Sequence, residues 1–284
     1  MLRKPAVAGT FYAGEKDSLK KQIEDCFLHP LGPGKIPAFT GKARGKILGL
    51  ISPHAGYVYS GPIAAWGFSY LIEREKSETV VILGPNHRGF GAPVAVMSQG
   101  EWETPLGRLS IDQEFAEKLL DIVPTIVEDD EKAHQREHSL EVQLPFLQYA
   151  WGNNFKIVPI CLTDQTTTTS INLGKAISEL IKERENVLLI ASTDFTHYQP
   201  QKIAEKEDRK LIDAIISGDP RNLGKLLSSY EFSMCGYGGV MTVMEVARLL
   251  GAGKIQLLKY ATSGDITGDY SAVVGYASLI IEKE

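Results

Sequence analysis

Four side chains that can bind a metal or move protons come shortly after apolar runs of this sequence. His54 and His87 follow two separate runs, and Asp194 and His197 follow a third. Short apolar runs bounded by polar residues are typical of strands buried on both faces of a parallel sheet. Residues just beyond the carboxyl ends of such strands line ligand-binding crevices. The spacing therefore indicates a metal site or a catalytic site at one edge of one sheet.

Cys235 is the cysteine whose surroundings point to chemistry, because it precedes a glycine-rich turn and a predicted helix in FSMCGYGGVMTV. The dipole and free N–H groups of a helix N-terminus stabilise a thiolate. We therefore expect a lowered thiol pKa and a role in metal binding or nucleophilic attack. Cys26 lies in an amphipathic helix pattern and Cys161 in an apolar run, so both are predicted to be small buried residues. Three widely spaced cysteines without a secretion signal predict no disulfide framework.

The segment EKAHQREHSLEVQLPF carries two further histidines ahead of a predicted helix. Ser139 could cap this helix, and Glu141 in its first turn would be favoured by the helix dipole. Neither residue then requires a function. Glu137 and His138 lie just ahead of the cap, and the pattern leaves open whether they face solvent or the same crevice. A lone histidine in such a place is more often a loop residue than a ligand, so only joint placement favours a site.

Apolar runs alternate with helical patterns along the chain. The runs are KILGLIS, TVVILG, APVAVMS, FKIVPICL, NVLLIAS, IQLLKYA and SAVVGYASLII. This alternation predicts an α/β fold with a mostly parallel, mixed central sheet and helices on both faces, and the short connection before APVAVMS suggests an antiparallel neighbour. Residues 29–46 and the threonine run at 163–170 are predicted loops. We expect one α/β domain spanning residues 1–284.

The composition is that of a globular chain large enough to form its own core. Of its 284 residues, 43% are hydrophobic and 23% are charged. The net charge of −5 and the scattered basic residues predict no nucleic-acid partner. The first residues lack the apolar core of a signal peptide, and no apolar run approaches the roughly 18 residues that span a bilayer. We therefore expect a cytoplasmic protein with no membrane partner.

Motifs from near the N-terminus to near the C-terminus support a family resemblance. They are AVAGTFY, ISPHAGYVYSGPIAA, LGPNHRG, REHSLEVQLPFLQ, STDFTHY, MCGYGG and TGDYSAVVGYAS. Together they resemble the Memo family, whose microbial members belong to the AmmeMemoRadiSam set. The resemblance implies a three-layer α/β/α fold similar to that of class III extradiol-type dioxygenases, which are non-haem iron enzymes. It also implies metal ligation by His54, His87 and Cys235, with Asp194 beside the site and His197 as the acid/base residue.

A cysteine in place of a carboxylate ligand changes what the metal site would prefer. Extradiol enzymes hold Fe(II) with two histidines and one carboxylate. A thiolate is softer, favours copper(I) or zinc as well as iron, and is itself oxidised by oxygen chemistry. We therefore expect iron or copper, with zinc as an alternative. Ring cleavage does not follow from the fold.

Three functions are compatible with these residues. The preferred one is a metal-binding redox protein or metalloenzyme in which His197 handles protons. The second is a non-catalytic adaptor that binds a peptide or small molecule in the same pocket. The third is a cysteine hydrolase that uses Cys235, His197 and Asp194. The substrate or partner is an unidentified small molecule or peptide. A hydrolase requires His197 within hydrogen-bond reach of the Cys235 sulfur, whereas a metal site requires the sulfur to lie close to His54 and His87.

Overall fold

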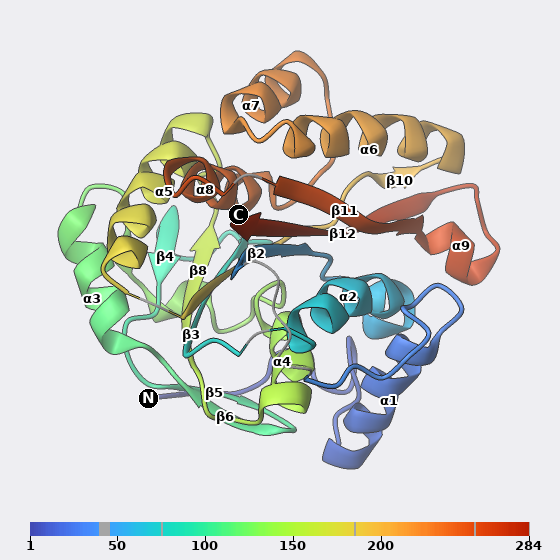
Figure 1. Ribbon diagram of the computed structural model, residues 1–284, viewed down its shortest axis with the longest axis horizontal. Coiled ribbons are helices and arrows are strands. Elements are labelled where there is room, and N and C mark those ends of the chain that lie inside the picture. The colour runs from blue at the N-terminus through green and yellow to red at the C-terminus, as the bar shows by residue number, and fades with distance from the viewer. Residues whose placement is uncertain (40–45, 75, 185, 253, 284) are drawn as a thin grey trace.

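A computed structural model of the protein describes residues 1–39, 46–74, 76–184, 186–252 and 254–283 (Figure 1). In this part of the chain, one nine-stranded sheet forms the centre of the molecule. Its order is β10 (His197–Gln199), β12 (Val273–Lys283), β2 (Lys46–Ser52), β9 (Val187–Ser192), β3 (Thr79–Pro85), β8 (Lys156–Leu162), β4 (Val94–Val96) and β7 (Glu128–Asp129), with β11 (Lys254–Thr262) paired to β12.

The centre of the sheet is parallel and its flanks are antiparallel. Strands β2, β9, β3 and β8 run parallel to one another, with β9 between β2 and β3. On one side β12 pairs antiparallel with β2. On the other side, β4 pairs antiparallel with β8. Strand β4 lies in the run APVAVMS, so the predicted antiparallel neighbour is confirmed. All seven apolar runs contain a strand, and the predicted mixed sheet is confirmed, with four parallel strands at its centre.

Helices cover both faces of the sheet, which makes three layers. One face packs on α1 (Lys16–Leu28), α2 (Tyr57–Ile72) and α4 (Leu144–Trp151), and the other on α3 (Gln113–Ile122), α5 (Thr167–Lys182), α6 (Gln201–Ile216), α7 (Pro220–Ser229) and α8 (Tyr237–Leu249) (Figure 1). Alternate residues of β3 serve the two layers. Val80 packs into the cluster with α1 and α2, whereas Val81 packs into the cluster with α5 and α8. The three-layer α/β/α fold is confirmed.

Several local features differ from the predictions. The threonine run is not a loop throughout, because Thr166 caps α5 and Thr167 begins it. Residues 29–39 contain no helix or strand, as predicted, and residues 40–45 of the same predicted loop lie outside the described residues. A small sheet of β1 (Leu2–Arg3), β5 (Glu101–Thr104) and β6 (Gly107–Ser110) was not predicted.

Three other short elements complete the described part of the chain. They are the 3₁₀ helices η1 (Glu131–Ala133) and η2 (Glu141–Gln143) and the helix α9 (Ser263–Thr267). Cys26 and Cys161 are buried, as predicted. None of the described helices has the length and apolar character needed to cross a membrane.

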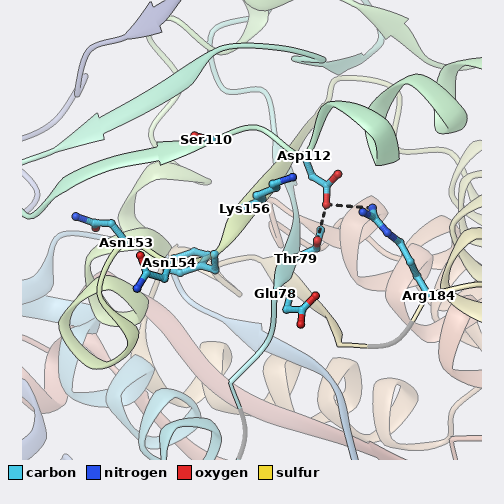
Figure 2. A pocket seen from close by; sticks show the side chains of 9 residues that line it. Glu78, Thr79, Ser110, Asp112, Asn153, Asn154, Lys156 and Arg184 are labelled. Atoms are coloured by element: carbon cyan, nitrogen blue, oxygen red, sulfur yellow. Dashed lines mark hydrogen bonds and ion pairs between the residues drawn. The ribbon is translucent and has the colours of Figure 1, made fainter.

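A polar pocket of about 370 Å³ lies at the amino ends of β3 and β8. Figure 2 shows Asp112, Thr79 and Arg184 pointing toward one another in its wall. Asp112 caps α3 by accepting the N–H of Phe115, and it also accepts hydrogen bonds from the Thr79 hydroxyl and, at 3.0 Å, from Arg184. The Asp112 carboxylate thus joins α3, β3 and the connection after α5. These contacts account for its burial structurally.

His134 is a buried, uncharged histidine that couples the stability of this fold to pH. It is 0% exposed, and its ring lies in an edge-to-face arrangement with that of Trp102, with the centroids 5.7 Å apart. Burial lowers the pKa of His134 to about 3, and the positive charge of Arg3 acts in the same direction. The His134 ring is therefore protonated at a much lower pH in the folded protein than in the unfolded chain.

Replacing His134 with leucine should flatten the loss of stability in acid. A pKa lowered by folding gives stability that is fully present above about pH 6.5 and is lost as the pH falls toward about 3, at about 1.4 kcal/mol per pH unit. Urea unfolding at pH 7, 6 and 5 measures this slope for His134→Leu and for the unaltered protein. Equal slopes for the two proteins would contradict the assignment.

Candidate metal centre

Neighbouring strands deliver the candidate ligands to one edge of the sheet. His54 follows β2, His87 follows β3, and Asp194 follows β9, which lies between these two strands. His138 joins them from the turn ahead of η2. One ligand atom from each of His54, His87 and His138 lies within 4.8 Å of the other two. The structure thus brings together two predicted ligands, His54 and His87, with His138, for which the sequence did not decide between solvent and the crevice.

Hydrogen bonds determine which nitrogen of His54 can bind a metal. His54 is 2% exposed, and its Nδ1 lies 3.0 Å from the Ser192 hydroxyl. That hydroxyl donates its one proton to the carbonyl of Ser139 at 2.6 Å and accepts from the Gln143 amide at 2.8 Å. Because the proton of Ser192 is already used, His54 Nδ1 must carry a hydrogen and donate it. Its Nε2 then carries no hydrogen and is the nitrogen that can bind a metal.

Glu137 determines which nitrogen of His87 carries the hydrogen. Its carboxylate is 0% exposed and lies 2.8 Å from His87 Nδ1. It also accepts the backbone N–H groups of His87, His138 and Ser139 at 2.6 to 2.9 Å. Burial would raise the pKa of Glu137, but the hydrogen bond with His87 and the other interactions around the carboxylate outweigh it and lower the pKa to about 2. The charged carboxylate therefore fixes His87 Nδ1 as a donor and leaves Nε2 free.

The three imidazoles are packed ring against ring. His138 stacks on His87 with centroids 4.6 Å apart and meets His54 edge-on at 5.5 Å. Burial lowers the pKa of His138 to about 4 and holds the pKa of His54 well below its usual range. Both rings are therefore neutral at pH 7, the form in which imidazole binds metals.

Cys235 lies beside this group, in the turn ahead of α8. Its Sγ is 3.2 Å from His54 Nε2 and accepts the N–H of Asp194 at 3.2 Å. The expectation of a lowered thiol pKa is wrong. Burial, followed by the charge of the Asp194 carboxylate, raises the pKa of Cys235, and these effects outweigh the helix N-terminus. Without a cation the group is a thiol.

Asp194 contacts the backbone of His54, and His197 lies three residues further along, at the start of β10. Asp194 accepts the backbone N–H of His54 at 2.8 Å, and burial raises its pKa to about 6. His197 is partly exposed, and its Nδ1 lies 2.8 Å from the carbonyl of Ser233, which can only accept, so its Nε2 is free. The histidine that contacts the Cys235 sulfur is His54.

The supporting residues were not recognised in the sequence. Ser139 does not cap a helix, since its hydroxyl donates to the carbonyl of Pro85 at 3.0 Å. Ser192 and Gln143 were not singled out at all, although they orient His54. A signal was present, because Ser139 and Gln143 lie in the motif that also carries Glu137 and His138. A segment with so many polar residues ahead of an apolar helix is unusual for a simple connection.

Comparisons with known proteins agree on one family. A family model described as Memo-like protein matches residues 3–280. A MEMO1 family protein of Methanopyrus kandleri is 47% identical over 284 residues, 100% of both chains. One from Methanocaldococcus jannaschii is 49% identical over 288 residues, 99% of each chain. The crystal structure of an uncharacterised Escherichia coli K12 protein matches with a TM-score of 0.54 at 13% identity, over 83% of this chain and 100% of that one, which indicates a similar fold.

Replacing Ser192 with alanine should weaken metal binding without removing a ligand. The change takes away the acceptor that holds His54 Nδ1–H, so the ring loses its fixed orientation, and outer partners of this kind typically alter metal affinity by about 10 to 100-fold. Ser52→Ala is the matched control, because Ser52 pairs with Ser192 across β2 and β9 and its buried hydroxyl has no partner among the described residues. Chelator competition measures both affinities. Equal affinities would refute the role of Ser192.

Proposed function

The chain belongs to the Memo family, and on that premise we propose that His54, His87 and His138 hold one transition-metal ion, iron or copper, with Cys235 as a sulfur donor at its edge. The observation that carries the proposal is the approach of three imidazole ligand atoms to within 4.8 Å of one another. In two of these rings, a hydrogen bond at Nδ1 leaves Nε2 as the nitrogen that can bind the ion. This arrangement is typical of metal-binding histidines.

The residues present fit a metal cation. The His54 and His138 rings are neutral at pH 7, and one ligand atom from each of the three imidazoles lies within 4.8 Å of the others, which suits a cation bound between them. Imidazole suits iron, copper and zinc, and a thiolate moves the preference toward copper(I), zinc or iron. A bound metal would also deprotonate the Cys235 thiol, whose pKa is otherwise raised. We favour iron or copper, and zinc is the alternative that metal analysis would reveal.

The neighbouring polar side chains suit proton transfer. A bound iron or copper would supply electron transfer or oxygen chemistry. The Nδ1 of His197 is held by the Ser233 carbonyl in a partly exposed position, so its Nε2 can accept or deliver a proton. Asp194 has a pKa near 6 and holds the backbone of His54. We assign His197 the acid/base role and Asp194 a supporting one, on an unidentified small molecule or peptide.

The contacts of the sulfur favour this function over a cysteine hydrolase. A hydrolase built from Cys235, His197 and Asp194 needs His197 at the sulfur. The sulfur instead contacts His54, whose other nitrogen donates to the Ser192 hydroxyl rather than to a carboxylate. A non-catalytic adaptor that uses the same pocket remains the alternative, and it requires neither a bound metal nor a free His197 nitrogen.

Protein prepared without oxygen or chelator should contain about one iron or copper ion per chain. His54→Ala and His87→Ala should lose this metal, because each removes a ligand nitrogen, whereas His197→Ala should keep it. His29→Ala is a histidine control outside the site. Elemental analysis gives the metal and its amount. Metal-free protein that binds neither ion on titration would refute the function and favour the adaptor.

Changing Cys235 to aspartate should alter which metal is preferred. A carboxylate oxygen in place of sulfur favours harder ions, so the affinity for copper(I) should fall more than the affinity for Fe(II). Competition between the two ions, measured for the unaltered protein and for Cys235→Asp, gives this ratio. His138→Ala provides the comparison, because it removes a nitrogen and leaves the sulfur. An unchanged ratio in Cys235→Asp would show that the sulfur is not a ligand.

A further inference from the structure

The N-terminal segment, defined as residues 3–12, lies against the turn that carries Glu137 and His138. Its first residue, Arg3, is only 5% exposed. Arg3 Nε donates to the carbonyl of His134 at 3.0 Å, and Nη2 donates to the carbonyl of Glu137 at 2.6 Å. The planar guanidinium therefore holds two backbone oxygens of the turn that supplies the carboxylate partner of His87.

Glu141 fixes the same segment at several points. Its carboxylate is 0% exposed, forms an ion pair with Arg3 and accepts a hydrogen bond from the Tyr12 hydroxyl. It also accepts the backbone N–H groups of Ala6 at 2.7 Å and Val7 at 3.2 Å. A buried charge is stable only when it is paired and hydrogen-bonded. Both ends of the segment are thus attached to η2.

Phe11 connects the segment directly to the candidate ligands. Its ring centroid lies 4.6 Å from that of His138. Its carbonyl accepts the backbone N–H of Tyr57 at 2.7 Å, at the start of α2 and three residues beyond His54. The N-terminal segment therefore bridges the His54 junction and the His138 turn, which are far apart in sequence.

We propose that the N-terminal segment is a positioning element of the metal centre, with Arg3 and Phe11 as positioning residues that fix His138 and Glu137 relative to His54. The inference rests on the proposed metal-binding function. Arg3 acts through the backbone of the turn, and Phe11 acts through the His138 ring and the start of α2. Neither is a ligand, so their replacement changes the geometry of the site and leaves its donor atoms in place.

Arg3→Lys tests the first of these residues. Lysine keeps a positive charge for Glu141 but lacks the planar fork that reaches two carbonyls at once. The affinity for Co²⁺, measured by chelator competition, should fall about 10 to 100-fold, and the Co²⁺ absorption spectrum should change shape. Lys4→Ala is the control, because Lys4 is the next residue and makes an exposed ion pair with Glu103 away from the site. It should match the unaltered protein in both measurements.

Phe11→Leu provides a second variant that does not disturb a buried ion pair. Phe11 is only half-buried, so the melting temperature of the metal-free protein should change little while Co²⁺ affinity falls. This variant decides the question if Arg3→Lys fails to fold. Variants that melt earlier but bind Co²⁺ with unchanged affinity and spectrum would overturn the proposal, because the segment would then be structural only.

Amide hydrogen exchange in metal-free protein separates this proposal from the proposed function. The N–H groups of His87 and Ser139 both donate to Glu137. They should exchange faster in Arg3→Lys than in Lys4→Ala. If the unaltered protein binds no metal and exchange still rises, the metal function fails and the positioning of Glu137 stands. Unchanged exchange in Arg3→Lys would overturn the positioning proposal whatever the metal result.

Discussion

The candidate site depends on one buried carboxylate. Glu137 accepts four hydrogen bonds, two from His87 and one each from the backbone of His138 and Ser139. A charge removed from water is tolerated only when such bonds replace its hydration. The requirement to satisfy one side chain therefore forces the loop after β3 and the turn before η2 to meet. Two imidazoles stack as a result of that meeting, and neither loop would specify this arrangement alone.

The order of the strands explains why chemistry gathers at one edge of the sheet and structural bonds at the other. Because β9 lies between β2 and β3, and all three run parallel, their carboxyl ends open onto one space. His54, His87 and Asp194 follow those ends. At the amino ends, the Asp112 carboxylate accepts hydrogen bonds from both Thr79 and Arg184, so its oxygens are already used (Figure 2). The pocket at the amino ends is therefore not the place where the candidate ligand atoms converge.

The sequence predicted the features that a few consecutive residues encode, such as the strands and the polar residues that follow them. It did not predict the features that depend on contacts between distant segments. Apolar runs located the strands, and the polar residues after them located His54 and His87, because both signals lie within a few residues of each other. Strand order is a long-range property, so the placement of β9 between β2 and β3 could not be deduced. The direction of Glu137 and His138 depends on Arg3, which lies on a distant segment and pairs with Glu141. The direction of the Cys235 pKa shift was predicted wrongly, because the position ahead of a helix can be read from nearby residues, whereas burial depends on the rest of the fold.

The hydrogen bonds that orient His54 and His87 use Nδ1 and are made to protein groups, on the side of each ring away from the proposed ligand nitrogen. They require no metal to form. A site supported in this way differs from a zinc finger, in which the binding energy of the metal is also the energy of folding. Little apolar surface should become buried when the ion enters, so the heat-capacity change of binding should be small. The protein would then resemble a rigid chelator, in which ion exchange proceeds without refolding of the chain.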